Sequence, residues 1–229
     1  MLNSKKLKNA SLIIFLLVQV VFWVFVVFSK TYTHYFTYAS VVASFVYVLA
    51  TLPKTRVELY QILAFAFTLV ADYFLVLKWN NYDIAMCFFL VVQLFYSTRV
   101  FLLTKSKKEK AIQGVLHGVV SVVAIILCKL VLKEGANLLA VVSVVYYFNL
   151  LVSLVFSFVH FKDSKTAKLL AFGLLCFALC DIHVGFETIS NIFNLSAGNF
   201  IYDLSHMKIS LVKIFYPPSQ TLLALGSKY

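Results

Sequence analysis

The feature that most constrains this chain is a series of continuous apolar runs, each about 20 residues long. A helix of that length crosses the hydrocarbon core of a bilayer at about 1.5 Å per residue, whereas barrel strands alternate over about ten residues. The runs therefore predict an all-α, polytopic membrane helix bundle, with about eight transmembrane helices in a single domain, residues 1–229. The predicted spans are Ala10–Phe28, Tyr35–Leu52, Val57–Leu77, Ile84–Leu103, Ile112–Leu132, Asn137–Phe161, Ala167–Ile189 and Ile209–Leu225.

Composition excludes a soluble domain of ordinary type. The chain is 62% hydrophobic and only 13% charged, where a soluble domain is about a quarter charged. The first run, Ala10–Phe28, is long for a signal peptide, and no small-x-small cleavage pattern follows it. We therefore expect it to be retained as the first span.

The net charge of +11 is carried mainly by the loops. No nucleic-acid-binding module is evident, so we expect no nucleic-acid partner. The placement of the positive charges instead indicates how the spans are oriented in the membrane. Thirteen Lys and Arg residues lie on one predicted side and five on the other, which places both termini in the cytoplasm. The expected location is the plasma membrane. The richer side holds Lys5, Lys6, Lys8, Lys54, Arg56, Lys105, Lys107, Lys108, Lys110, Lys162, Lys165, Lys168 and Lys228.

Two aspartates interrupt apolar spans, Asp72 in "LVADYFLVLKW" and Asp181 in "LLCFALCDIHVGF". A charge at membrane depth costs several kcal/mol and marks a functional site by default. Both spans run outward, which puts Asp72 about 9 Å and Asp181 about 12 Å from the outer ends. Tyr216 lies at a similar depth in the last span, with the polar side chains of Gln93, Tyr96 and Gln220 somewhat deeper. Shared depth permits one common site in the outer half of the membrane.

Other polar residues leave alternatives open. Lys213 lies near the depth of Asp72 and either pairs with it or reaches a lipid phosphate at the interface. Pro217 and Pro218 remove two helical hydrogen bonds, which frees the carbonyls of Lys213 and Ile214. The connection "SNIFNLSAGNFIYDLSHMK" has room for a short interfacial helix.

Four residues of metal-binding types lie along one face of the seventh predicted span. Cys176, Cys180, His183 and Glu187 recur on one helical face. These are ordinary zinc ligands, but one straight helix rarely supplies more than two ligands to one ion. We therefore expect no metal.

Four short motifs carry a resemblance to a known family. They are "ADYFL", "FFLVVQLFY", "LLCFALCD" and "FYPPSQTLLAL", spread over most of the chain. Together they resemble the lysoplasmalogenase-like (YhhN) integral membrane protein family. The sequence departs from the family pattern at Ala71, Gln93 and Cys180, where glycine, histidine and serine are usual. The matching positions are Asp72, Leu75, Phe89, Tyr96, Gly173, Phe177, Asp181, Tyr216 and Gln220.

The resemblance implies hydrolysis of the vinyl ether bond of a lysoplasmalogen, which releases a fatty aldehyde and a glycerophospho-head group. It implies Asp72 and Asp181 as the catalytic acid and base, with Gln93, Tyr96, Tyr216 and Gln220 binding the substrate. The expected partners are the lysophospholipid and membrane lipids, and no cofactor is expected. The alternatives are a proton-coupled transporter and a lipid-binding membrane protein without activity. Neither the oligomeric state nor the preferred head group follows from the sequence.

Overall fold

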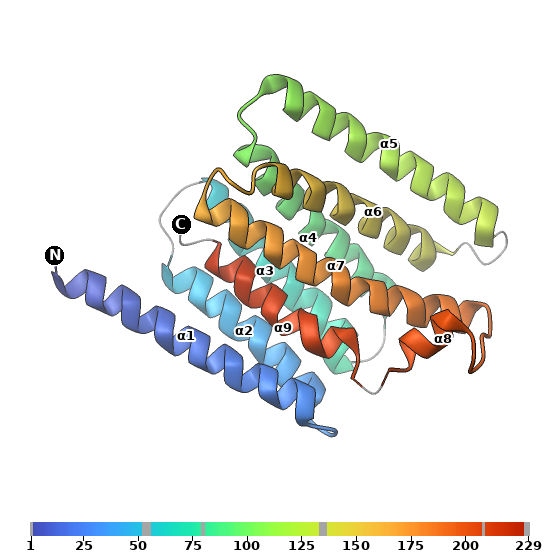
Figure 1. Ribbon diagram of the computed structural model, residues 1–229, viewed down its shortest axis with the longest axis horizontal. Coiled ribbons are helices and arrows are strands. Elements are labelled where there is room, and N and C mark those ends of the chain that lie inside the picture. The colour runs from blue at the N-terminus through green and yellow to red at the C-terminus, as the bar shows by residue number, and fades with distance from the viewer. Residues whose placement is uncertain (1, 52–55, 79–80, 133–136, 208, 227–229) are drawn as a thin grey trace.

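Helices account for almost all of the chain in a computed structural model, which describes residues 2–51, 56–78, 81–132, 137–207 and 209–226. No strand occurs within these ranges. Eight long helices and one short one follow each other along the chain (Figure 1). They are α1 (Leu2–Phe28), α2 (Thr33–Thr51), α3 (Arg56–Asp72), continued by the π-helix η1 (Tyr73–Lys78), α4 (Tyr82–Leu103), α5 (Lys107–Leu132), α6 (Leu138–Val159), α7 (Lys165–Ile192), α8 (Phe200–Ser205) and α9 (Leu211–Leu225).

Each predicted span coincides with one long helix, and the ends differ by a few residues. Helix α6 stops at Val159, and His160 caps its C-terminus. Helix α9 begins at Leu211 because the Ser210 side chain accepts a hydrogen bond from the backbone of Val212. The end of the second predicted span, at Leu52, lies outside the described residues. The short helix expected in the long connection is confirmed as α8.

Among the described residues, six helices are long and apolar enough to cross a membrane: α1, α3 with η1, α4, α5, α6 and α7. A multi-pass membrane protein is therefore the architecture. Helix α2 is rich in threonine, serine and tyrosine, and α9 has only 15 residues, or about 22 Å at about 1.5 Å per residue. For these two helices, membrane crossing stays a prediction.

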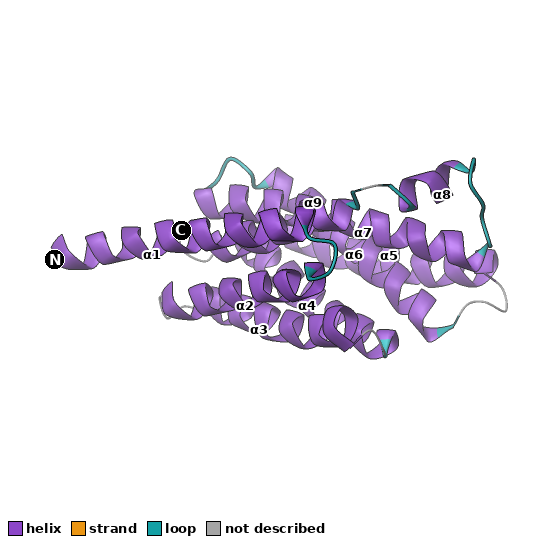
Figure 2. Ribbon diagram, turned by 90° about the horizontal axis from the view of Figure 1, so that it is seen from below, coloured by secondary structure: helices purple, strands orange, loops and turns teal. Residues whose placement is uncertain are grey.

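The helices run up and down between two ends of the bundle. One end carries α8, and we call it the α8 end. At the other, the terminus end, α1 begins and α9 finishes (Figure 1). Helices α1 and α5 form opposite edges, with α1 packed on α2 and α9 and α5 packed on α6. The start of α1 projects beyond the other helices at the terminus end (Figure 2).

Helices α7 and α9 approach closely because Gly173 has no side chain. A Cβ added there would lie 2.7 Å from Cγ of Leu223, well inside van der Waals contact. Small residues permit such close packing in membrane bundles, where apolar burial cannot drive helices together. By contrast, Gly114 and Gly118 of α5 face open space within this chain.

A buried arginine ties α3 and α4 to the end of α9. Arg99 is 2% exposed, and its guanidinium donates to Oε1 of Gln61 and to the carbonyl of Gly226, the latter at 3.2 Å. Gln61 Nε2 in turn donates to the carbonyl of Leu223 at 3.1 Å. The last carbonyls of a helix have no partner within the helix. We call these three side-chain contacts the Arg99 clamp.

Polar contacts also hold α1. Gln19 donates to the carbonyl of Ser40 and to Oγ of Ser44, both at 2.9 Å. The indole of Trp23 donates to the carbonyl of Ile214 at 3.1 Å. That carbonyl is one of the two expected to be freed by the prolines, so α1 supplies the hydrogen bond that α9 cannot make for itself.

Candidate functional site

Asp72 lies where the α-helical part of the third span ends. It is the last residue of α3, and the backbone continues as the π-helix η1. Short π-helical segments within helices occur frequently at functional sites. The side chain is 1% exposed, and Oδ2 accepts a hydrogen bond from the Tyr216 hydroxyl at 2.5 Å. Oδ1 is buried without a hydrogen-bond partner among the described residues.

Asp181 is held in the same way by a different tyrosine. It lies on α7 and is half-buried. Its Oδ2 accepts a hydrogen bond from the hydroxyl of Tyr146 on α6, again at 2.5 Å. Tyr146 itself is only 4% exposed. Each aspartate therefore pairs with a buried phenol from a neighbouring helix.

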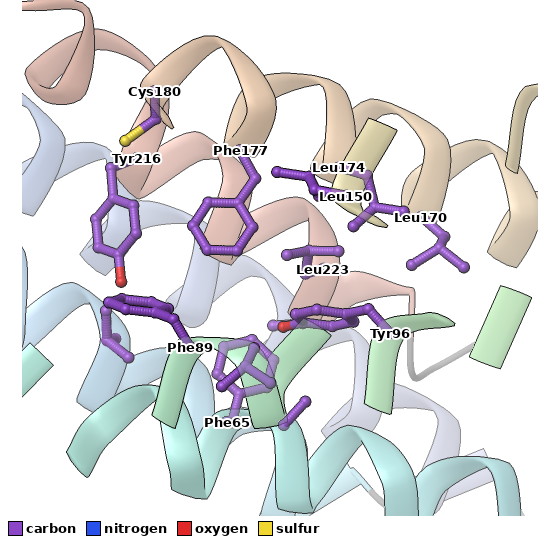
Figure 3. Close-up of a cluster of buried hydrophobic side chains, with 14 of the residues drawn as sticks. Phe65, Phe89, Tyr96, Leu150, Leu170, Leu174, Phe177, Cys180, Tyr216 and Leu223 are labelled. Atoms are coloured by element: carbon purple, nitrogen blue, oxygen red, sulfur yellow. The ribbon is translucent and has the colours of Figure 1, made fainter. Parts of the chain in front are cut away.

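Two phenylalanines connect the two pairs. The ring of Phe177 lies 5.9 Å from that of Tyr216 and 6.2 Å from that of Phe89, measured between centroids. Phe89 in turn lies 6.2 Å from Tyr146. These tilted rings are in the range of favourable aromatic contacts. We call the two Asp–Tyr pairs and the two phenylalanines the aspartate site, and Figure 3 shows three of its rings, Tyr216, Phe177 and Phe89, together in the core.

The other predicted binding residues occupy different surroundings. Gln93 donates to Oγ of Ser153 at 2.9 Å and to Oγ of Ser97 at 3.3 Å, so it links α4 to α6. Tyr96 and Gln220 are fully buried, and their side-chain polar atoms have no hydrogen-bond partner in the described chain. Gln220 lies four residues after Tyr216 and shares its face of α9. That all of these residues line one cavity stays a prediction.

Lys213 resolves one of the alternatives raised by the sequence. Its Nζ lies 3.4 Å from Oγ1 of Thr33, at the start of α2. Tyr216 takes the hydrogen-bonding position on Asp72 instead. Within the described ranges, the ion pairs all involve His160, with Glu109 and Asp163. Lys213 is therefore not the partner of Asp72.

Tyr146 is the functional candidate that sequence reasoning missed. It lies in "VVSVVYYFNLL", within an apolar span that contains no charged residue. The sequence held a signal for it, because a buried tyrosine hydroxyl usually finds a hydrogen-bond partner. Asp181 was available as that partner. Depth alone could not choose between Tyr146 and its neighbour Tyr147.

The stripe of Cys176, Cys180, His183 and Glu187 forms no cluster suited to a metal ion. No group of three His, Cys, Asp or Glu side chains is close enough, as far as the described residues show. Cys180 and His183 are buried, whereas Glu187 is exposed. The residues do not converge on a point that an ion could occupy.

The aspartate site combines an apolar wall with two carboxyl groups that differ in their surroundings. Asp72 is fully buried and keeps one oxygen without a partner, whereas Asp181 is half-buried. Two carboxyl groups in different environments can divide acid and base roles between them. The site is thus suited to proton transfer to and from an apolar substrate.

Comparison with known proteins supports the family resemblance. The model of the YhhN family matches residues 32–226, from just before α2 to the end of α9. All the residues of the aspartate site fall within this match. No curated protein and no solved structure matches the chain.

Proposed function

Because this chain belongs to the YhhN family, we propose that it is an integral membrane hydrolase that cleaves the vinyl ether bond of lysoplasmalogens. The products are a fatty aldehyde and a glycerophospho-head group. The observation that carries the proposal is the aspartate site, in which two tyrosine-bound carboxyl groups lie in an aromatic wall. Apart from these groups, the side chains of the site, Phe89 and Phe177, are apolar and buried.

The chemistry requires a proton donor and a water-activating base. A carboxylic acid delivers a proton to the carbon of the double bond that is not attached to the ether oxygen. The electron pair of the double bond forms the new C–H bond. The resulting oxocarbenium ion is stabilised by the second carboxylate, which also takes a proton from the attacking water. The hemiacetal then breaks its bond to the glycerol oxygen, which receives a proton, and the aldehyde leaves.

The surroundings of the two aspartates favour different roles. Asp72 has a buried, unpartnered oxygen that is free to carry the transferred proton. Asp181 is less completely buried than Asp72, which leaves room beside it for the attacking water. We therefore assign Asp72 as the acid and Asp181 as the base, with Tyr216 and Tyr146 orienting them.

The proposed topology places this chemistry in the outer half of the plasma membrane. It has eight membrane-crossing helices and both termini in the cytoplasm, in accord with the excess of Lys and Arg at the terminus end. The aspartate site then lies nearer the α8 end, which faces outward.

The test is incubation of the purified protein with a lysoplasmenyl lipid and measurement of free aldehyde. Wild-type protein should release aldehyde, whereas the Asp72→Asn, Asp181→Asn double variant should not. A lipid with a saturated ether at the same position serves as the substrate control, because it has no double bond to protonate. Absence of release from the wild type across several pH values and detergents would refute the enzyme and leave the transporter or lipid-binding alternative.

A further inference from the structure

Lys213 occupies a distinctive position beside the aspartate site. It lies in the first turn of α9, three residues before Tyr216 and seven before Gln220. These spacings place all three residues on one helical face. The same face that carries the hydroxyl bound to Asp72 therefore begins, at the α8 end, with a cation.

The ammonium of Lys213 has unused hydrogen-bonding capacity. An ammonium has three donors, and the one contact seen is with the neutral hydroxyl of Thr33, at 3.4 Å. That hydroxyl itself donates to the carbonyl of Ser29 at 2.6 Å, which leaves its oxygen to face the ammonium. None of the ion pairs among the described residues includes Lys213. A half-buried cation without a carboxylate partner is suited to binding an anion.

The spacing along α9 matches the proposed substrate. Lys213 and Tyr216 are separated by about 4.5 Å along the helix axis, at about 1.5 Å per residue. In a lysoplasmalogen, only the glycerol backbone separates the ether oxygen from the phosphate, so both groups are within reach of side chains one helical turn apart. A lipid that runs along this face of α9, with its ether bond at Asp72, directs its phosphate toward Lys213.

We propose that Lys213 binds the phosphate of the lysophospholipid and thereby sets the position of the ether bond relative to Asp72. The inference rests on the proposed function for the identity of the substrate, but its geometry is independent of cleavage. A lysine serves a phosphate well as a compact charge. The site selects ether lipids that carry a phosphate over ether lipids that carry a free glycerol.

The competing explanation is that Lys213 simply extends toward the lipid head groups, as lysines near helix ends do. Its position on the inward face with Tyr216 and Gln220, which are 5% and 0% exposed, argues against this. A lysine that only extends to the interface makes no distinction between bound ligands. The two explanations therefore predict different binding data.

The experiment measures equilibrium binding to the purified full-length protein in a maltoside detergent, which contains no phosphate. The ligands are a saturated alkyl-ether lysophospholipid, which cannot be cleaved by protonation, and the matching alkylglycerol without phosphate. The variants are Lys213→Met, which keeps the length of the side chain, and Lys213→Arg, which keeps the charge. Lys78→Met is the matched control, because Lys78 is an exposed cation at the same end of the bundle. Lys213→Gln replaces Lys213→Met if the latter does not fold.

The expected result is that Lys213→Met binds the phosphate-bearing lipid about tenfold more weakly than wild type, the scale of a charge-assisted hydrogen bond. Its affinity for the alkylglycerol should not change, and Lys213→Arg and Lys78→Met should resemble wild type. Unchanged affinity of Lys213→Met for the phosphate-bearing lipid overturns the inference. Equal weakening for both ligands also overturns it, because the lysine would then act through structure.

Competition identifies the source of the phosphate. Inorganic phosphate and a diacyl phospholipid should displace the bound lysophospholipid only at much higher concentrations. Displacement by either at equal concentration overturns the assignment to a lysophospholipid. Aldehyde release is measured separately, so binding that depends on Lys213 in a protein that releases no aldehyde rejects the enzyme and keeps the binding site. Release of aldehyde by a protein whose lipid binding does not depend on Lys213 keeps the enzyme and rejects the binding site.

Discussion

At the scale of single residues, two phenol groups determine how the aspartates are presented. The hydroxyl of Tyr216 donates a hydrogen bond to one oxygen of Asp72, and that of Tyr146 donates one to an oxygen of Asp181. A carboxyl group held in this way keeps a defined orientation, and in Asp72 the other oxygen has no partner among the described residues. Such fixed orientation lowers the entropy lost when a reacting group must be aligned.

The first prediction concerns the carboxyl groups themselves. Asp72→Asn and Asp181→Asn should each lower the rate of aldehyde release by about 10²–10⁴-fold, because asparagine keeps the shape but cannot transfer a proton. The rates are compared at equal amounts of folded protein, judged by thermal unfolding. Cys176→Ser serves as the control and should change the rate little. An Asp→Asn variant with wild-type activity would reject the two-carboxylate mechanism.

The second prediction concerns the tyrosines. Tyr146→Phe and Tyr216→Phe remove one hydrogen bond each but keep the ring contacts with Phe89 and Phe177. We expect the rate to fall by about 10- to 100-fold, generally less than for the aspartates, since a hydrogen bond to a charged group contributes about 1.5–3 kcal/mol. The measurement is kcat together with KM, and the loss should fall on kcat.

Tyr60→Phe is the matched control for these variants. Tyr60 lies on α3 with its ring 6.2 Å from that of Phe95, away from the aspartates. Its substitution should leave kcat unchanged. If Tyr146→Phe behaves like Tyr60→Phe, the hydroxyl of Tyr146 has no role in the reaction.

Sequence reasoning reached part of this site through depth. Asp72, Asp181 and Tyr216 were expected in one layer of the membrane, and the first and third of these are in direct contact. Gln93 was expected just below this layer, but its side chain turns toward Ser153 on α6. Depth fixes one coordinate only, and the direction in which a side chain points depends on which helices are neighbours.

At the scale of helices, the pairing of α7 with α9 positions the aspartate site. Gly173 allows Leu223 to approach within 2.7 Å of the place that a Cβ would take. The contact lies toward the terminus end from Phe177 and Tyr216, on the same two helices. A change in this spacing would move Tyr216 relative to Phe177.

The third prediction tests this contact. Gly173→Ala should destabilise the protein by about 1–3 kcal/mol, the usual cost of overpacking a core, and should reduce aldehyde release as well. A second substitution, Leu223→Ala, should restore part of the stability by removing the clash. Thermal unfolding in detergent provides the measurement.

Gly118→Ala is the matched control, because nothing lies within 4 Å of the Cβ that it adds. Alanine favours a helix over glycine by about 1 kcal/mol. The control should therefore be neutral or slightly stabilising. Equal losses in the two variants would show that the packing of Gly173 is not special.

Helix positions were predictable from the sequence, but helix neighbours were not. Each long apolar run became a helix, because backbone groups in a bilayer must bond within their own segment. In a soluble protein an apolar stripe shows which face is buried. Here lipid-facing residues such as Val115 and Val122 are as apolar as buried ones such as Val92 and Val100, so hydropathy carries no such information.

At the scale of the whole molecule, charge and helix number determine orientation. The terminus end carries the excess of Lys and Arg, and α1 begins and α9 ends there. If all eight long helices cross the membrane, both termini lie on one side.

The fourth prediction follows from this arrangement. Reporter proteins fused at Lys107 and after Tyr229 should both report the cytoplasm. A reporter inserted at Gly198, in the exposed loop before α8, should report the opposite side. An external signal at Lys107 or Tyr229 would contradict the count of eight crossings.

The Arg99 clamp has a consequence for the order in which this protein can be assembled. A ribosome delivers α3 and α4 early, so Arg99 and Gln61 meet while α9 is still unmade. The carbonyls of Leu223 and Gly226 are their remaining partners, and they are synthesised only after both of these helices. Until then the guanidinium of Arg99 is buried in a partly assembled bundle without all of its hydrogen-bond partners, at a cost in free energy. Arrival of α9 removes that cost, which makes the docking of α9 the event that locks α3 and α4 together.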